Sequence, residues 1–333
     1  MTRARKHIHI TLLQAVIALL SPSFLLSSCS SSDDGFSEPN PQDEKQEIRF
    51  NPGVWNFMEG TRAATFDNQL DLQEGTFKCY AYLDGTANLY IDGSTVSYAN
   101  SQWSFNDGKH YWPASGALNF FAHMPADLPS YYTFDPTAYD SSTNPDGYSE
   151  DCPRIVCTNL PVNLTAGSDA TQELVIAYTA QQDKTGSVPA KQPTAGEVAM
   201  TFKHPFAKVK FMLSAASGTN VKVNSITIPD IKNNGSFTFD GSTITWTPNG
   251  DDANFVISGN PATDDDTVYL VIPNDYGSKT LTVSATWNDW SNVTKNVSAI
   301  VSFDWTAGFS YTYTLTLSKY ALEVSTSKYT EQW

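Results

Sequence analysis

The strongest constraint on the fold is a succession of short runs rich in Val, Ile, Thr, Tyr, Phe and Trp, separated by Gly, Asn, Asp and Pro. Many of these runs alternate between apolar and polar residues and recur every 8–12 residues or so, which is typical of β-sandwiches and barrels. Aromatic residues make up 13% of the chain and charged residues only 17%, and both values favour a β-rich extracellular protein. The sequence therefore predicts an all-β protein.

The N-terminus has the layout of a secretory signal followed by a lipidation site. A basic patch precedes an apolar stretch from Ile8 to Leu26, and small residues lie just before Cys29. This pattern resembles a bacterial lipobox, in which a lipid is attached to the cysteine before cleavage. The alternative is an uncleaved membrane helix, but the stretch barely reaches the roughly 20 residues that span a bilayer and contains a proline. We expect removal of residues 1–28 and a lipid on Cys29 that attaches the chain to the outer membrane.

The predicted mature chain begins with a segment that is poor in apolar residues. Residues 29–46 are rich in Ser, Pro, Asp and Glu, so they predict a flexible acidic tether. Their first part resembles the acidic export tag of surface-exposed lipoproteins in Bacteroidetes, although an ordinary periplasmic linker has a similar composition. The remaining length suits two domains. We expect an N-terminal β-sandwich at 47–196 and a C-terminal β-sandwich with a tail strand at 197–333.

The charge and the motifs exclude several classes of function. The formal net charge of −15 argues against a nucleic-acid partner, since such binding relies on Lys and Arg. The sequence has no phosphate-binding loop, no HExxH and no GxSxG, so we expect no cofactor and no enzyme. His123 and His204 suggest a metal pair, but neither has an acid or Cys at ligand spacing. We expect structural histidines and no metal site.

Three cysteines besides Cys29 and one turn signal allow local predictions. Cys79 alternates with apolar neighbours and is predicted to be a buried small hydrophobe. Cys152 and Cys157 are close enough to form a disulfide in an oxidising compartment, and both states stay open. The sequence NDG at residues 106–108 predicts a hairpin that pairs SQWSF with KHYWP.

Four runs carry a resemblance to a known family: GTRAATFD (60–67), KHYWPASGALNFFAHMP (109–125), VAMTFKHPFAKVKFML (198–213) and WTAGFSYTYTLTLSK (305–319). In order and spacing they resemble the fimbrillin family of Bacteroidetes, whose members polymerise into fimbriae. The resemblance implies two transthyretin-like β-sandwich domains and a structural subunit that supports adhesion. It also implies other fimbrial subunits as partners, and a location in a fimbrium at the cell outer membrane.

The resemblance further implies assembly by strand exchange. In fimbrillins of this kind, a protease with trypsin-like specificity cuts after an Arg, and the first strand then leaves a groove for a strand of another subunit. The candidate cut follows Arg62, whereas Arg49 is a second possibility inside the expected strand. The cut would separate the body from the lipid on Cys29, so an anchor, a stalk and a tip subunit all remain open.

The C-terminal tail is the candidate donor strand. Leu322 and Val324 share one face of an alternating run, and Tyr329 and Trp333 would add aromatic anchors. The alternative is an ordinary last strand of the C-terminal sandwich.

A rival hypothesis is a monomeric surface lipoprotein that binds glycans, with host or bacterial surface molecules as ligands. Exposed tryptophans would supply stacking platforms, although most large aromatics in sandwiches belong to the core. The candidates are Trp55, Trp103, Trp246, Trp287, Trp290 and Trp305.

Overall fold

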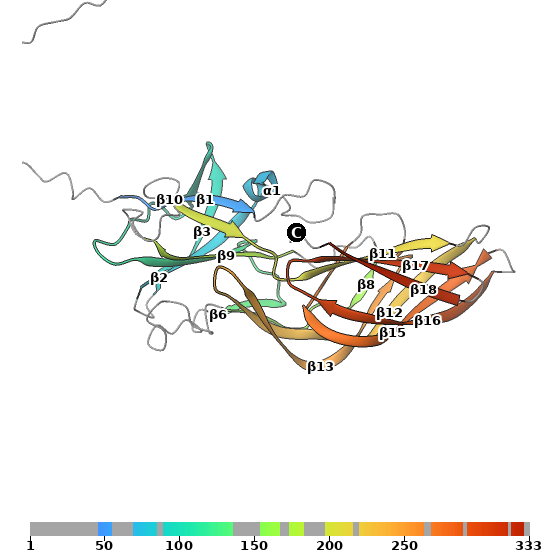
Figure 1. Ribbon diagram of the computed structural model, residues 1–333. Coiled ribbons are helices and arrows are strands. Elements are labelled where there is room, and N and C mark those ends of the chain that lie inside the picture. The colour runs from blue at the N-terminus through green and yellow to red at the C-terminus, as the bar shows by residue number, and fades with distance from the viewer. Residues whose placement is uncertain are drawn as a thin grey trace, which may run out of the picture. The chain divides into compact units, whose positions relative to one another are not determined.

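The structure is a computed structural model, and it describes residues 46–54, 69–84, 89–135, 154–166, 173–182, 197–215, 220–262, 268–288, 292–318 and 321–329. The chain divides into two compact units, Met1–Glu44 and Lys45–Trp333. Every described residue belongs to the second unit, whose strands are drawn in Figure 1.

The described residues form strands almost throughout, which confirms the predicted all-β fold. In β17, for example, Tyr311, Tyr313, Leu315 and Leu317 are buried at every second position, because successive strand residues face opposite sides.

One short helix, α1 (Gln69–Glu74), accompanies the strands, and nothing helical in the described ranges is long and apolar enough to cross a membrane. The strands are β1 (Arg49–Val54), β2 (Thr76–Leu83), β3 (Leu89–Ala99), β4 (Gln102–Phe105), β5 (Leu118–Met124), β6 (Tyr132–Asp135), β7 (Arg154–Cys157), β8 (Asn163–Thr165), β9 (Val175–Gln182), β10 (Glu197–Phe202), β11 (Ala207–Ala215), β12 (Val221–Phe239), β13 (Ile244–Ser258), β14 (Tyr269–Val271), β15 (Asn274–Trp287), β16 (Val293–Trp305), β17 (Ser310–Ser318) and β18 (Ala321–Tyr329).

The first sheet has the strand order β10-β1-β4-β3-β2-β5-β9, and its two ends meet. Ile176 in β9 and Lys203, directly after β10, exchange backbone hydrogen bonds of 2.9 and 2.8 Å. The hydroxyl of Thr179 also donates to the carbonyl of Ala199 at 2.7 Å. The sheet therefore closes on itself around its own core of Phe, Trp, Leu, Met and Val side chains.

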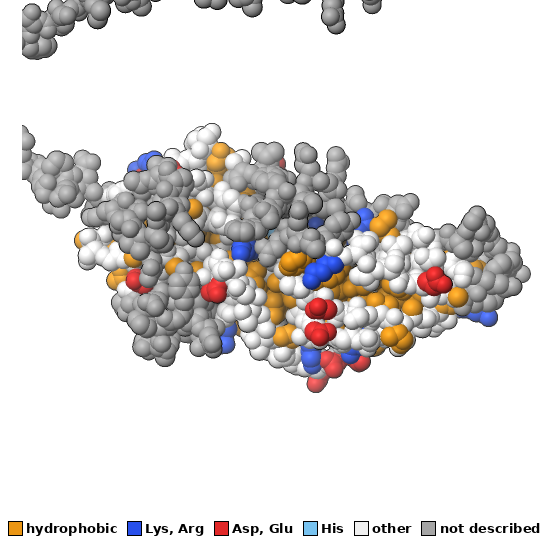
Figure 2. Space-filling model, viewed as in Figure 1, with side chains coloured by type: hydrophobic (Ala, Val, Ile, Leu, Met, Phe, Trp, Pro, Cys, Tyr) orange, Lys and Arg blue, Asp and Glu red, His pale blue; other side chains and the backbone are white. Residues whose placement is uncertain are grey.

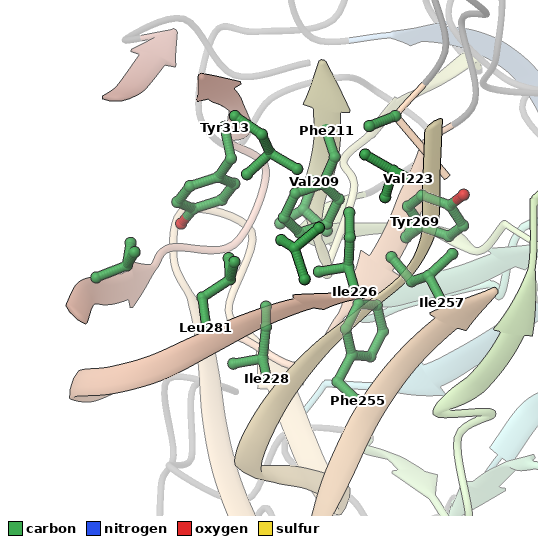
Figure 3. Close-up of a cluster of buried hydrophobic side chains, with 14 of the residues drawn as sticks. Val209, Phe211, Val223, Ile226, Ile228, Phe255, Ile257, Tyr269, Leu281 and Tyr313 are labelled. Carbon is green, nitrogen blue, oxygen red and sulfur yellow. The ribbon is translucent and has the colours of Figure 1, made fainter. Parts of the chain in front are cut away.

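Two further sheets pack against each other around a second core, as in a β-sandwich. One has the order β14-β11-β17-β18, and the other runs β16-β15-β12-β13-β8, with β7 and β6 attached through β12. Figure 3 shows Phe211 and Tyr313 from the first of these sheets near Ile226 and Leu281 from the second. All four side chains are buried.

A third apolar cluster joins the first sheet to β12. The beginning of β12 pairs with β15, whereas residues 235–238 of the same strand pair with β7. In this later part, Phe237 and Phe239 belong to one cluster with Phe121 of β5 and Tyr178 of β9. A single strand thus contributes to two cores.

The strands before residue 196 and the strands after it do not form separate sheets. β10 begins at Glu197 but pairs with β1 in the first sheet. β7 and β8 come earlier in the chain but pair with β12 and β13. The sheets therefore exchange strands across the predicted boundary, and the division into domains at 47–196 and 197–333 stays a prediction.

The predicted hairpin at residues 106–108 is wrong. β4 pairs with β3 through Asn100 and Ser101, whose φ angles of 53° and 61° are left-handed, as in the tightest hairpin turns. The KHYWP run pairs elsewhere, because Tyr111 forms an isolated bridge with Glu47. The NDG sequence does mark a turn, but the turn does not join paired strands.

Candidate functional site

The residues predicted to act in assembly fall partly within the described ranges. Three of them lie outside these ranges: Cys29, Arg62 and Trp333. Leu322 and Val324 lie in β18, and the backbone of Tyr329 ends that strand. The first strand, β1, is also described. The candidate assembly site is therefore built from β1, its surroundings and β18.

β1 lies inside the first sheet, between β10 and β4. It runs parallel to β10 through six pairs of partners that begin with Arg49 and Glu197. Toward β4 it is antiparallel, and the register consists of Phe50 opposite Trp103. A polar cleft of about 420 Å³ opens beside this seam. The backbone bonds of β1 are thus concentrated on its β10 side.

The residues just before β1 pair with another part of the chain. The amide of Ile48 donates to the carbonyl of His110 at 2.8 Å, and the amide of Trp112 donates to the carbonyl of Gln46 at 2.9 Å. A segment that begins at residue 46 therefore forms backbone bonds first with residues 110–112 and then with β10.

Apolar burial holds β1 in the sheet. Ile48 and Phe50 are 3% and 5% exposed. The ring centroid of Phe50 lies 5.5 Å from that of Phe77, 5.2 Å from that of Phe105 and 6.0 Å from that of Phe120. All three pairs have edge-to-face geometry. Burial of two such side chains contributes on the order of 3–6 kcal/mol.

Charged contacts add little to the attachment of β1. The carboxylate of Glu47 lies 3.1 Å from the Lys109 ammonium and 3.6 Å from the Arg49 guanidinium. Both basic side chains are more than half exposed, and such exposed pairs contribute at most about 1 kcal/mol. A strand that left this position would therefore give up mainly apolar contacts and backbone hydrogen bonds.

β18 lies at one end of the four-stranded sheet and pairs antiparallel with β17 along its whole length. Leu322 is 9% exposed and Val324 is half-buried, and both pack on the sandwich core. The following residues, 325–328, are exposed. Lys328 reaches back to the Thr306 hydroxyl at 3.2 Å and lies over the ring of Phe309. Among the described side chains of β18, one is therefore buried and one is half-buried.

The two histidines have separate structural partners. Nδ1 of His123 lies 2.9 Å from the carbonyl oxygen of Pro125, and burial lowers the pKa of His123 to about 4. Nδ1 of His204 lies 2.9 Å from Oε1 of Glu173, and both side chains are buried. Within the part of the chain that is described, no three His, Cys, Asp or Glu side chains are placed to hold a metal ion.

The described cysteines are buried free thiols. Cys79 is fully buried, as its alternation predicts, and burial raises its pKa well above the usual range. Burial raises the pKa of Cys157 to about 12. Cys157 forms no disulfide, and Cys152 lies outside the described residues. Neither described thiol has the low pKa of a reactive cysteine.

Most of the described tryptophans belong to the cores. Trp103, Trp287 and Trp305 are no more than 4% exposed. Trp246 is half-buried and lines an open cleft. Trp55 and Trp290 lie outside the described residues.

Solved structures share this fold. A fimbrial protein from Bacteroides vulgatus ATCC 8482 aligns over 86% of this chain and 99% of its own, with a TM-score of 0.54 and 15% identity. A candidate cell adhesion protein from Bacteroides uniformis ATCC 8492 aligns over the same shares, with a TM-score of 0.51 and 14% identity. At such identities the likeness concerns the fold alone.

The sequence comparison with families is more specific. No curated protein matches the sequence. The family described as fimbrillin-like matches residues 61–333, which is most of the chain. This agrees with a structural subunit of fimbriae rather than an enzyme. The chain belongs to the fimbrillin-like family.

Proposed function

We propose that this chain is a structural subunit of cell-surface fimbriae, exported as a lipoprotein through Cys29 and assembled by proteolysis and strand exchange. The observation that carries the proposal is the position of β1. It is an inner strand of a closed sheet, and the candidate cleavage residue, Arg62, follows it in the sequence. Cleavage there would break the covalent link between β1 and the body of the subunit.

Loss of β1 would create a groove with both elements of strand recognition. One wall is the backbone of β10, whose hydrogen-bonding groups would lose their partners in β1. The floor includes Phe77, Phe105 and Phe120, which would lose their contacts with Phe50. An incoming strand gains main-chain hydrogen bonds from the wall and apolar burial from the floor.

β18 is the candidate donor to such a groove. It is an end strand, and among its described side chains Leu322 is buried and Val324 is half-buried. From Ile48 into β1, the buried side chains Ile48, Phe50 and Pro52 lie at every second residue, and Leu322 and Val324 have the same spacing. The side chain of Tyr329 and all of Trp333 lie outside what the structure describes, so their role as anchors stays a prediction.

Variants at the two arginines test the cleavage step. Wild-type and variant chains are expressed in the native cell, and the N-termini of surface-extracted protein are mapped by mass spectrometry. We expect polymers to begin at Ala63, and we expect Arg62→Ala to keep Cys29 attached and to block polymerisation. Arg49→Ala is the matched control and should polymerise normally. Polymers composed of intact lipidated chains would refute the cleavage step.

A truncation tests the donor. Deletion of residues 320–333 should leave a folded monomer that accepts a strand but cannot donate one, and electron microscopy should show no fibres. Normal fibres from the truncated chain would refute the role of β18.

The same mapping separates an anchor from a stalk or tip subunit. An anchor keeps the lipid on Cys29, whereas in a stalk or tip subunit the lipid serves only for delivery.

A further inference from the structure

A cleft of about 410 Å³ opens where the end of β10, the β12–β13 turn and the β16–β17 turn come together. Its volume lies within the range of small-molecule sites, which is roughly 300–1,000 Å³. β1 contributes nothing to its lining, so the cleft is separate from the assembly groove proposed above.

Trp246 supplies a rigid aromatic surface in the cleft. Its indole Nε1 donates to the carbonyl of Pro205 at 2.6 Å. Its ring centroid lies 5.1 Å from that of Phe206 and 4.7 Å from that of Phe237. Because these contacts fix the indole, a ligand that stacks on its accessible part loses no side-chain entropy there.

Hydroxyl groups surround this surface on rigid turns. Ser242 and Thr243 line one rim, and the carboxylate of Asp240 accepts hydrogen bonds of 2.7 Å from both of their amides. Thr306 lines another rim, and its amide donates to the Tyr311 hydroxyl at 2.9 Å. Polar groups of this kind can orient a ligand that is itself rich in hydroxyls.

Lys203 places a positive charge in the wall. Its ammonium donates to the carbonyl of Ser242 at 2.8 Å and lies 5.3 Å from the ring centre of Phe239. Burial lowers the pKa of Lys203, although Asp240 opposes this shift, so an anion nearby would favour the charged form. On the face shown in Figure 2, basic and acidic side chains lie singly or in small groups.

We propose that this cleft binds a short saccharide that carries a carboxylate. A sugar ring stacks on Trp246, its hydroxyls bond to the rims formed by Ser242, Thr243 and Thr306, and its carboxylate pairs with Lys203. An apolar ligand would leave the rim hydroxyls without partners, and a neutral sugar would not use the charge of Lys203.

The test measures binding to the purified chain by isothermal titration calorimetry, with two acidic probes and their neutral counterparts. The acidic probes are 3′-sialyllactose and digalacturonic acid, and the neutral counterparts are lactose and α-1,4-galactobiose. We expect saturable binding of at least one acidic probe, at least tenfold tighter than its counterpart. Lys203→Met should weaken that binding at least tenfold, because it keeps the apolar stem but removes the charge.

Lys279→Met is the matched control, since it removes a cation that pairs with Asp230 outside the cleft. It should bind the acidic probe as the unaltered chain does. Thermal unfolding establishes that both variants are folded. The proposal is overturned if neither acidic probe binds, if the neutral counterpart binds equally well, or if Lys203→Met binds like the control. Because the binding is measured on monomers, its failure leaves the assembly proposal intact.

Discussion

Nδ1 of His204 lies 2.9 Å from Oε1 of Glu173, and these side chains are 1% and 6% exposed. The pair joins the segment before β9 to the segment after β10, near the place where the first sheet closes. Replacement of Glu173 by Ala leaves a buried imidazole without its acid. Removing the polar partner of a buried group in this way costs about 1–3 kcal/mol.

Urea unfolding of Glu173→Ala should therefore show a loss of about 1–3 kcal/mol in unfolding free energy. Asp135→Ala is the matched control, because Asp135 pairs with the partly exposed Arg154 at 2.8 Å and contributes at most about 1 kcal/mol. Equal losses in the two variants would contradict the buried character of the His204 pair.

His123 predicts a loss of stability in mild acid. Burial lowers its pKa from 6.5 to about 4 in the folded chain. As the pH falls below 6.5, the unfolded chain takes up the proton first, so the unfolding free energy decreases until the pH nears 4. The full effect of this one group is about 3 kcal/mol.

The check for His123 is a comparison of unfolding free energies at pH 7.5 and pH 4.5 for the unaltered chain and for His123→Gln. Gln can still donate to the Pro125 carbonyl but does not titrate. The variant should be less stable than the unaltered chain at pH 7.5 and should lose less stability between the two pH values. The same loss in both proteins would show that other groups cause the acid sensitivity.

The contacts of Phe50 predict how much core packing stabilises β1 in the sheet. Phe50→Ala removes a ring that contacts Phe77, Phe105 and Phe120, so the uncleaved chain should lose about 3–5 kcal/mol of unfolding free energy. Asn51→Ala changes the exposed neighbour in the same strand and should alter stability by less than about 0.5 kcal/mol. Guanidinium unfolding of the two variants gives the comparison, and similar values for both would mean that β1 is not held by this core.

Local periodicity accounts for much of the fold. The alternation in β17 and the apolar neighbours of Cys79 are visible in the sequence, because strand side chains face opposite sides in turn. The pairing of β10 with β1 is not visible in the sequence. A strand shows the same two-residue alternation of side chains whichever strand it pairs with. The sequence does not predict the turn at Asn100, because Asn-Ser is a weaker hairpin signal than the nearby NDG.

The sequence predicts the candidate assembly site in part. Ile48 and Phe50 lie in a segment that the sequence marks as a strand, and Leu322 and Val324 lie in the expected tail strand. The cleft at Trp246 and Lys203 had no sequence signal beyond a list of tryptophans. Its lining residues come from segments separated by up to about a hundred residues, and only the folded chain brings them together.

The continuity of β12 through two cores has a mechanical consequence. A tensile load on the first sheet would reach Phe121 and Tyr178, pass to Phe237 and Phe239 through the third cluster, and then follow the backbone of β12 into the sandwich. Within the described residues, the two cores are thus coupled by packed side chains and by one continuous strand. In the proposed fibre, this coupling would make the two cores of a subunit resist a pull together.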